Sequence, residues 1–277
     1  MWVKRTPDNI PYINAVDMTA NGITVDEDLI LRTAFDECGC LLILDLFDES
    51  EIDNLKNHFD HKFSHKTAAQ LENDHHTLGD GRYLITMSLE PPFDNPSLYA
   101  HPHLMYVMHS LFLGEEFLID NFSAVQSLPG SNAQRIHRDH DPLFMKNLPL
   151  TELLPCYAIG VVIPLVDINL QCGSTVLYPG THKNIGPTGP KPPGVPAYPQ
   201  LKRGSVYLWD YRLAHNGMAN NADYARPILT FLYARSWFSD VKNLKKEGPI
   251  YLSMEQYKKI PELFKPLFDR LRWQIKD

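Results

Sequence analysis

The stretch FLIDNFSAVQSLPGSNAQRIHRD, residues 117–139, shows the pattern that decides the fold of this chain. It holds two runs rich in strand-forming residues, 117–128 and 133–139, and the Pro-Gly pair between them is typical of a turn. Similar runs recur before and after it, at residues 82–90, 157–165, 174–178, 205–210 and 227–237. Many short strands separated by Gly, Pro and Asn predict a β-sandwich or a β-barrel.

Helices are expected mainly before this β-rich region. Residues 24–38 begin with a capping-box pattern, TVDE, and place apolar residues four apart, and Gly39 can end the helix in a left-handed conformation. The apolar run at 40–47 has the length of a strand, and the pattern after it predicts a second helix from Asp48. A third helix is predicted at 102–113, because proline suits a first helical turn and a glycine follows the end.

Two later segments differ from the strands. Residues 185–199, IGPTGPKPPGVPAYP, are too rich in proline and glycine for regular structure and form either a stiff connection or a wall over a pocket. The tail at 253–273 has a helical pattern that is interrupted near Pro261 and Pro266. We expect the tail to pack its apolar side chains against the sheet: Leu263, Phe264, Leu267, Phe268 and Leu271.

Composition and charge exclude several classes of protein. The 277 residues include 26 Lys and Arg against 33 Asp and Glu, which gives a formal net charge of −7. Binding of nucleic acid irrespective of its sequence needs a basic face, so we expect no nucleic-acid partner. No apolar stretch reaches the roughly 18 residues of a membrane span, and the first residues lack the apolar core of a secretory signal. We therefore expect a cytoplasmic protein without a membrane partner, and the oligomeric state stays open.

The cysteines, Cys38, Cys40, Cys156 and Cys172, are expected to be reduced and buried. A chain of this length can bury an adequate core without disulfides, and nothing in the sequence indicates secretion. Their spacing does not match that of a zinc site, so we interpret them as structural thiols.

The segment QRIHRDHD, residues 134–141, is the first candidate for chemistry. Residues two apart on an extended chain share a face, so His137 and Asp139 can present an imidazole and a carboxylate to one point. These groups are part of the 2-His-1-carboxylate set that holds non-haem Fe(II) and leaves positions open on the metal. An HxD pair also occurs by chance in solvated turns, so it needs support from elsewhere in the chain.

Support comes from two residues far along the sequence. His215 lies in WDYRLAHNG, residues 209–217, where a strand ends beside a Gly/Asn turn. Arg226 then opens an apolar run. An arginine that leads into a buried strand is costly unless it meets an anion, and a guanidinium suits the two oxygens of a carboxylate.

Several motifs follow one another in an order that resembles the phytanoyl-CoA dioxygenase family of Fe(II)/2-oxoglutarate-dependent oxygenases. After the HxD pair come GSTVLYPGTH at 173–182, Gly-Ser at 204–205, HNG at 215–217 and finally Arg226. The helix–strand–helix start of the chain is also similar to that family. The resemblance implies a mainly β fold with flanking helices, a double-stranded β-helix, which is a jelly-roll, cupin-like barrel.

The resemblance also implies how the chain is organised and what it catalyses. We expect one oxygenase domain over 1–277, in which 1–115 supports a jelly-roll core at about 117–240 and 250–277 forms a helical tail. The implied cofactors are Fe(II), 2-oxoglutarate as cosubstrate and O2. In such a reaction 2-oxoglutarate is oxidised to succinate and CO2 while a bound substrate is oxidised. A carboxylate at Asp139 disfavours halogenation, because iron halogenases have a small residue there.

The resemblance assigns roles to individual residues. Three would bind the metal and act in catalysis: His137, Asp139 and His215. Arg226 would pair with the far carboxylate of 2-oxoglutarate, and Thr175 would donate its hydroxyl to the same carboxylate. Gln134 would contact the cosubstrate near the metal. His182 is expected to be structural or to line the pocket.

The identity of the small-molecule substrate stays open at this level. The candidate contacts are an arginine, methionines and aromatic residues: Arg82, Tyr83, Met87, Phe144, Met145, Tyr178, Trp209 and Trp237. No strongly basic groove for CoA phosphates is evident, so we expect oxidation of a small metabolite of natural-product metabolism. Hydroxylation is the default, and desaturation, epoxidation or ring formation are other outcomes. An acyl-CoA hydroxylase of the same family is the alternative.

Two other classes of protein fit parts of the pattern. A non-catalytic jelly-roll binding protein could keep the shape and the ligand residues. A cupin-like metalloenzyme could bind its substrate directly to the metal, which would leave Arg226 and Thr175 without a task. Joint binding of iron and 2-oxoglutarate distinguishes these classes from an oxygenase.

Overall fold

The computed structural model describes residues 2–18, 24–140, 143–144, 153–184, 194–243, 250 and 252–270. Its larger sheet has nine strands in the order β1-β2-β3-β9-β7-β11-β6-β5-β4, and only β2 and β3 pair in parallel. The bounds are β1 (Lys4–Arg5), β2 (Pro11–Asn14), β3 (Cys40–Leu44), β4 (His76–Gly79), β5 (Arg82–Thr86), β6 (Phe117–Ser127), β7 (Ala158–Pro164), β9 (Val206–Asp210) and β11 (Arg226–Arg235). A smaller sheet pairs β8 (Thr175–Leu177) with β10 (His215–Gly217).

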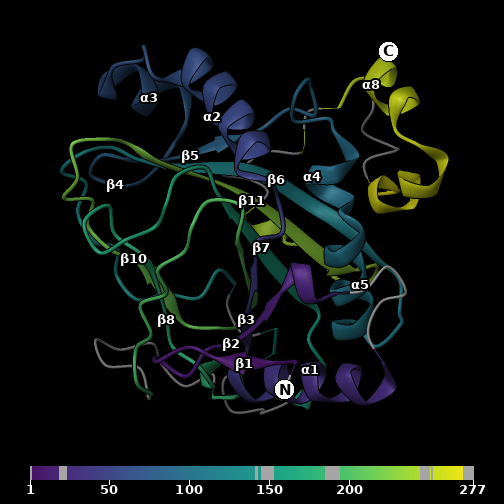
Figure 1. Cartoon of the computed structure of the whole chain (residues 1–277). Coiled ribbons are helices and arrows are strands. Elements are labelled where there is room, and N and C mark those ends of the chain that lie inside the picture. The colour runs from purple at the N-terminus through teal and green to yellow at the C-terminus, as the bar shows by residue number, and fades with distance from the viewer. Residues whose placement is uncertain are drawn as a thin grey trace.

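Helices flank the larger sheet. The described ones are α1 (Val25–Cys38), α2 (Glu49–Phe63), α3 (Ala68–Asp74), α4 (Pro96–Ala100), α5 (Pro102–Leu111) and α8 (Met254–Lys259), with 3-10 turns η1 (Ala15–Asp17), η2 (Thr181–Lys183) and η3 (Glu262–Phe268). Figure 1 shows α4, α5 and the C-terminal segment on one side of this sheet and the small β8–β10 sheet on the other. Among the described helices, none has the length and apolar character needed to cross a membrane.

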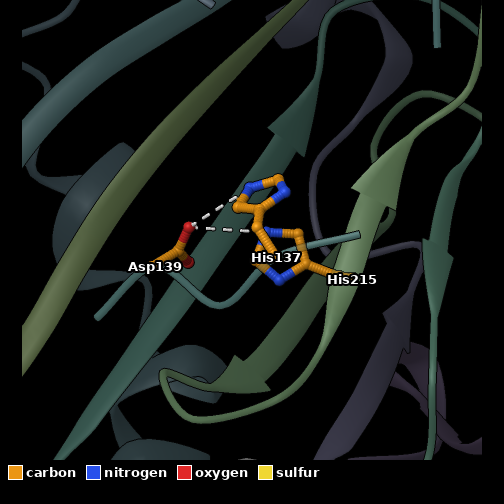
Figure 2. A group of neighbouring side chains, drawn as sticks. All are labelled: His137, Asp139 and His215. Carbon is orange, nitrogen blue, oxygen red and sulfur yellow. Dashed lines mark ion pairs between the residues drawn. The ribbon is translucent and has the colours of Figure 1, made fainter. Parts of the chain in front are cut away.

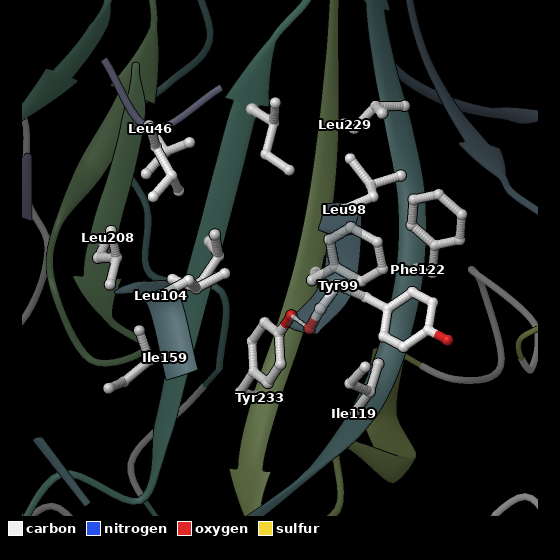
Figure 3. Packing of buried hydrophobic residues seen from close by; sticks show 14 of the residues in the cluster. Leu46, Leu98, Tyr99, Leu104, Ile119, Phe122, Ile159, Leu208, Leu229 and Tyr233 are labelled. Atoms are coloured by element: carbon white, nitrogen blue, oxygen red, sulfur yellow. Dashed lines mark hydrogen bonds between the residues drawn. The ribbon is translucent and has the colours of Figure 1, made fainter. Parts of the chain in front are cut away.

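Strand β11, which lies between β7 and β6, has one face toward the hydrophobic core and the other toward the inside of the barrel, because successive residues on a strand face opposite ways. Leu229 and Tyr233 face the helices, where they pack with side chains of α4 and α5 (Figure 3). The hydroxyl of Tyr233 donates to the carbonyl oxygen of Tyr99 in α4 at 2.6 Å. The residues that alternate with them line the interior cavity: Arg226, Ile228, Thr230 and Leu232. The predicted mainly β fold with flanking helices is confirmed.

Several elements begin and end as their sequences predict. The hydroxyl of Thr24 accepts the N–H of Glu27 at the start of α1, and Gly39 ends this helix with φ +71°. A Cβ atom at Gly39 would overlap the imidazole of His182, so both the backbone conformation and the packing require glycine. The strand predicted at 40–47 is shorter, because Asp45 adopts φ +54° directly after β3.

The strand predicted at 133–139 is not a regular strand. These residues are extended and meet β10 through one bridge, in which His137 and His215 exchange backbone hydrogen bonds of 2.9 Å. The side-chain oxygen of Gln134 accepts the N–H of Gly217 at 3.0 Å. This side-chain oxygen therefore replaces the backbone carbonyl oxygen that would accept the N–H of Gly217 if the β-ladder continued.

The prediction for the tail is wrong at one residue. In a 3-10 helix residues three apart share a face, so Phe264 and Leu267 of η3 both pack against the core. Leu263 lies on the other face and is 81% exposed, and Phe268 is fully buried. Leu271 and most of the proline-rich connection, 185–193, lie outside the described residues.

All four cysteines are unpaired, as expected for structural thiols. Cys38, Cys40 and Cys172 are buried and Cys156 is half-buried.

Candidate metal centre and cosubstrate pocket

His137, Asp139 and His215 come together beside the first residue of β10. The bridge between His137 and His215 places their imidazole ring centroids 4.5 Å apart. Nε2 of His215 lies 3.4 Å from Oδ1 of Asp139, and Nε2 of His137 lies 3.9 Å from it (Figure 2). One ligand atom from each of the three residues lies within 4.8 Å of the other two. Side chains that are far apart in the sequence thus converge on one point.

Both imidazoles are oriented by their own backbone. Nδ1 of His137 is 2.9 Å from the carbonyl oxygen of Arg135, and Nδ1 of His215 is 3.1 Å from that of Leu213. A carbonyl oxygen only accepts, so Nδ1 carries the hydrogen in each ring and Nε2 keeps its lone pair. Such a bond fixes the tautomer and the ring angle of a metal-binding histidine.

The carboxylate of Asp139 is held in its ionised form. Burial alone would raise its pKa, but His215, His137 and Trp209 lower it to about 2. The indole Nε1–H of Trp209 donates to Oδ2 at 3.3 Å, which leaves Oδ1 facing the two imidazoles. Burial would also lower the pKa of His215, but Asp139 outweighs it and raises this pKa. A proton and a metal ion therefore compete for Nε2 of His215.

These donors fit Fe(II). Two imidazoles and one carboxylate on one side of an ion form the set used by non-haem Fe(II) oxygenases, and they leave three positions for other ligands. Bonds of about 2 Å from one ion to each donor need only small shifts of side chains whose donor atoms already lie within 4.8 Å.

A second group of polar residues lies deeper in the same cavity, which has a volume of about 160 Å³. Arg226 is 2% exposed, and its Nη2–H donates to the hydroxyl of Ser127 at 3.0 Å. Its Nη1–H donates to the carbonyl oxygen of Gly173. Nε of Arg226 has no hydrogen-bond partner among the described residues.

Arg82 on β5 is the second buried guanidinium of this pocket, with 1% of its surface exposed. It donates to the carbonyl oxygen of Met218 at 2.7 Å and to Oε1 of Gln134 at 3.4 Å. Burial and the charge of Arg226 lower its pKa to about 9. A Cβ atom at Gly217 would collide with Nη1 of Arg82, so this glycine permits the approach of the arginine.

The two guanidiniums have no carboxylate partner in the part of the chain that the structure describes. Two buried cations side by side are costly unless an anion joins them. Thr175 and Gln134 line the same cavity as the arginines and the metal-binding group. The cavity therefore has ligands for a metal ion at one end and cationic hydrogen-bond donors for a carboxylate at the other.

The structure brings only some of the predicted substrate contacts to this cavity. Arg82 and Trp209 line it. Tyr83 and Met87 instead lie in the core under the helices, because they alternate with the inward-facing residues on and after β5. They are withdrawn as substrate contacts.

The remaining candidates do not line the described cavity. Tyr178 packs behind β8, and its hydroxyl donates to Oδ1 of Asn216 at 3.3 Å. Trp237 and Phe144 are 55% and 43% exposed. Met145 lies outside the described residues. His182 packs on Gly39 and contacts the carbonyl oxygen of Asp36 at 3.0 Å, in keeping with a structural role.

Sequence reasoning missed several residues that line the cavity, among them Asn121 on β6 and Thr230 and Leu232 on β11. The alternation of β6 and β11 carried a signal for them. Alternation alone does not tell which of the two sets of alternate side chains faces the cavity, because this depends on the pairing register of the strands.

A jelly-roll barrel with this metal-binding group and buried guanidiniums defines a class, the Fe(II)/2-oxoglutarate-dependent oxygenases. Residues 35–228 match the family model described as Phytanoyl-CoA dioxygenase (PhyH). The match covers more than half of the chain, which therefore belongs to that family. Its cofactors are Fe(II), 2-oxoglutarate and O2.

Similar proteins agree with this assignment. The chain is 24% identical over 230 residues to dioxygenase hkm4 of Aspergillus hancockii, with 75% of this chain and 71% of that protein covered. The carbocyclase SnoK from nogalamycin biosynthesis has a TM-score of 0.61 at 17% identity and covers 84% of this chain and 94% of its own. HygX from Streptomyces hygroscopicus, with nickel, 2-oxoglutarate and hygromycin B bound, has a TM-score of 0.57 at 16% identity and covers 83% and 96%. At these identities the solved structures establish the double-stranded β-helix fold.

Proposed function

We propose that the protein is a dioxygenase that hydroxylates a small metabolite of natural-product metabolism and converts 2-oxoglutarate to succinate and CO2. The observation that carries the proposal is the pairing, in one cavity, of a 2-His-1-carboxylate group with two buried guanidiniums that lack a carboxylate partner among the described residues. A dicarboxylic keto acid satisfies both ends, because one carboxylate and the keto oxygen can chelate the metal while the far carboxylate meets the arginines.

Each residue has a task in this proposal. His137, Asp139 and His215 hold iron by one face, and with 2-oxoglutarate and O2 the iron supplies the oxidising power. Arg226 and Thr175 hold the far carboxylate of the cosubstrate. We place Arg82 in this group rather than among the substrate contacts, since it donates to Gln134 and lies close enough to Arg226 for that charge, together with burial, to lower its pKa.

The alternatives fit the cavity less well. An acyl-CoA substrate needs cations for its phosphates, and the arginines of the described cavity wall are both buried at the cosubstrate end. A cupin-like enzyme without a keto acid leaves Arg82 and Arg226 with no anion to bind. SnoK acts in nogalamycin biosynthesis and HygX was solved with hygromycin B, which supports a metabolite of that kind.

The proposal is tested by measuring succinate release. Purified protein is incubated in air with Fe(II), 2-oxoglutarate and a panel of small metabolites, and products are examined by mass spectrometry. We expect one or more panel members to increase succinate release above the substrate-free rate and to gain one oxygen atom. A chelator serves as the control and should stop release. Substrate conversion that continues without 2-oxoglutarate would contradict the proposal.

Trp209 offers a prediction about the support of the metal site. Trp209→Phe removes the indole hydrogen bond to Oδ2 of Asp139. We expect Fe(II) affinity to fall by about 10-fold or more, because loss of a group that orients a ligand commonly costs 10–100-fold. Trp237→Phe is the matched control, since Trp237 is 55% exposed and lies outside the described cavity. Equal affinities for the two variants, measured by anaerobic calorimetry, would contradict this role.

A further inference from the structure

Asn121 on β6 is a buried amide that the proposed reaction does not yet use. It is 8% exposed and lines the cavity. Its Oδ1 accepts the hydroxyl hydrogen of Ser123 at 2.6 Å. Its Nδ2 makes no hydrogen bond among the described residues and is not one of their fully enclosed polar atoms, so it is accessible from the cavity. The amide N–H groups therefore face the cavity without an acceptor.

A bulge in β6 directs Asn121 into the barrel. Leu232 of β11 pairs with Asn121, but the next residue, Tyr233, pairs with Ile119, so Asp120 is an extra residue. Bulges of this kind re-aim side chains and are common beside active sites. Without it, Asn121 and Ile119 would share a face of the sheet.

Asn121 lies in the same row of paired residues as Trp209, which contacts the metal-binding group. The pairing register runs in one row from Asn121 to Leu232, then to Gly160 on β7, then to Trp209 on β9. Trp209 donates to Asp139, so this row leads across three strand spacings of about 4.8 Å to the metal site. Gly160 has no side chain, and a Cβ atom there would come within 3.1 Å of Nε1 of Trp209. The indole of Trp209 therefore lies over Gly160, and the side chain of Leu232 stands between it and the amide in this row.

Apart from Asp139 of the metal-binding group, the cavity wall near Asn121 carries no formal charge. Asn121, Leu232, Gly160 and Trp209 are all neutral, and Thr230 beside them already donates its hydroxyl to the carbonyl oxygen of Ser123 at 3.3 Å. Arg226 lies at the other end of the cavity, where it pairs with Ser127, six residues along β6 from Asn121. The formal charges of the cavity wall thus lie in the metal-binding group and at the cosubstrate end.

We infer that Asn121 selects the substrate: its amide donates a hydrogen bond to the carbonyl oxygen of an uncharged, largely apolar molecule that lies in the cavity beside Leu232 and Trp209. This inference rests on the proposed function and adds the chemical class of the substrate. A neutral carbonyl compound satisfies the amide, whereas a carboxylate or an ammonium group would be desolvated without a counter-ion.

The test compares four ligands with one skeleton: α-tetralone, tetralin, tetralin carboxylate and aminotetralin. Binding is measured by calorimetry to the full chain loaded with Zn(II) and 2-oxoglutarate, which does not turn over. We expect α-tetralone to bind at least about 10-fold more tightly than tetralin, and also more tightly than the carboxylate and the ammonium compound. A site that hydrogen-bonds one ligand group discriminates strongly against an analogue that lacks it.

Two variants separate recognition from folding. Asn121→Leu keeps the size of the side chain, and we expect α-tetralone to lose about 10-fold in affinity, equal to one hydrogen bond of about 1.4 kcal/mol, while tetralin binds as before. Asn121→Asp should reverse the preference towards aminotetralin. Retained 2-oxoglutarate binding shows that each variant is folded.

The inference is overturned if the unmodified protein binds the ketone no more tightly than tetralin, or if Asn121→Leu weakens both equally. It is also overturned if the carboxylate binds best. Failure of the proposed function would appear elsewhere, as absence of 2-oxoglutarate binding to the metal-loaded protein.

Discussion

His215→Ala is expected to abolish succinate release and to lower Fe(II) affinity by more than about 100-fold. The side chain is 5% exposed, and its Nε2 lies 3.4 Å from Oδ1 of Asp139, within the metal-binding group. Its loss leaves two of three donors, and even changes to groups that merely orient a ligand cost 10–100-fold. Metal affinity is measured by anaerobic calorimetry and turnover by succinate release.

The control for this variant is His58→Ala. His58 is exposed on α2, where its Nδ1 contacts the carbonyl oxygen of Asn54 at 3.0 Å. We expect this variant to bind iron and release succinate as the unmodified protein does. Undiminished turnover in His215→Ala would remove His215 from the set of metal ligands.

Arg226→Ala is expected to raise the 2-oxoglutarate concentration required for half-maximal turnover by about 100-fold and to leave Fe(II) affinity nearly unchanged. Removing one partner of a buried, charge-assisted contact costs about 2–5 kcal/mol, and 1.4 kcal/mol corresponds to a factor of ten. Arg226 makes its hydrogen bonds to Ser127 and Gly173 and none to the metal-binding residues.

Arg226→Lys gives a graded comparison. Lysine keeps the charge but loses the planar pair of donors that fits a carboxylate, so its 2-oxoglutarate requirement should fall between those of the unmodified protein and Arg226→Ala. If Arg226→Ala loses iron binding and 2-oxoglutarate binding together, the arginine is structural and the assignment of the cosubstrate pocket is wrong.

Local chemistry made much of the fold predictable. The capping box at Thr24 and the glycine at Gly39 bound α1 as expected, because both act within one turn of the chain. The spacing of His137 and Asp139 predicted a shared direction, and the structure brings both to His215. Arginine at the start of a buried strand predicted an anion site, and Arg226 is indeed buried.

The rest depended on contacts between distant segments. Arg82 and Tyr83 are neighbours, yet one faces the cavity and the other the core, and only the pairing of β5 with β6 decides which. The inward direction of Asn121 depends on the bulge at Asp120, which no local pattern reveals. The inward direction of Arg82 could therefore not be derived from the local pattern, and the amide of Asn121 was missed.

An anaerobic titration of the protein with Fe(II) and 2-oxoglutarate tests the central claim most directly. Chelation of Fe(II) by the keto acid produces a weak visible charge-transfer band, and the account predicts this band only when both are present. It should be absent in His215→Ala and need far more 2-oxoglutarate in Arg226→Ala. Iron that binds tightly without the band at saturating 2-oxoglutarate, or no iron binding at all, would contradict the account.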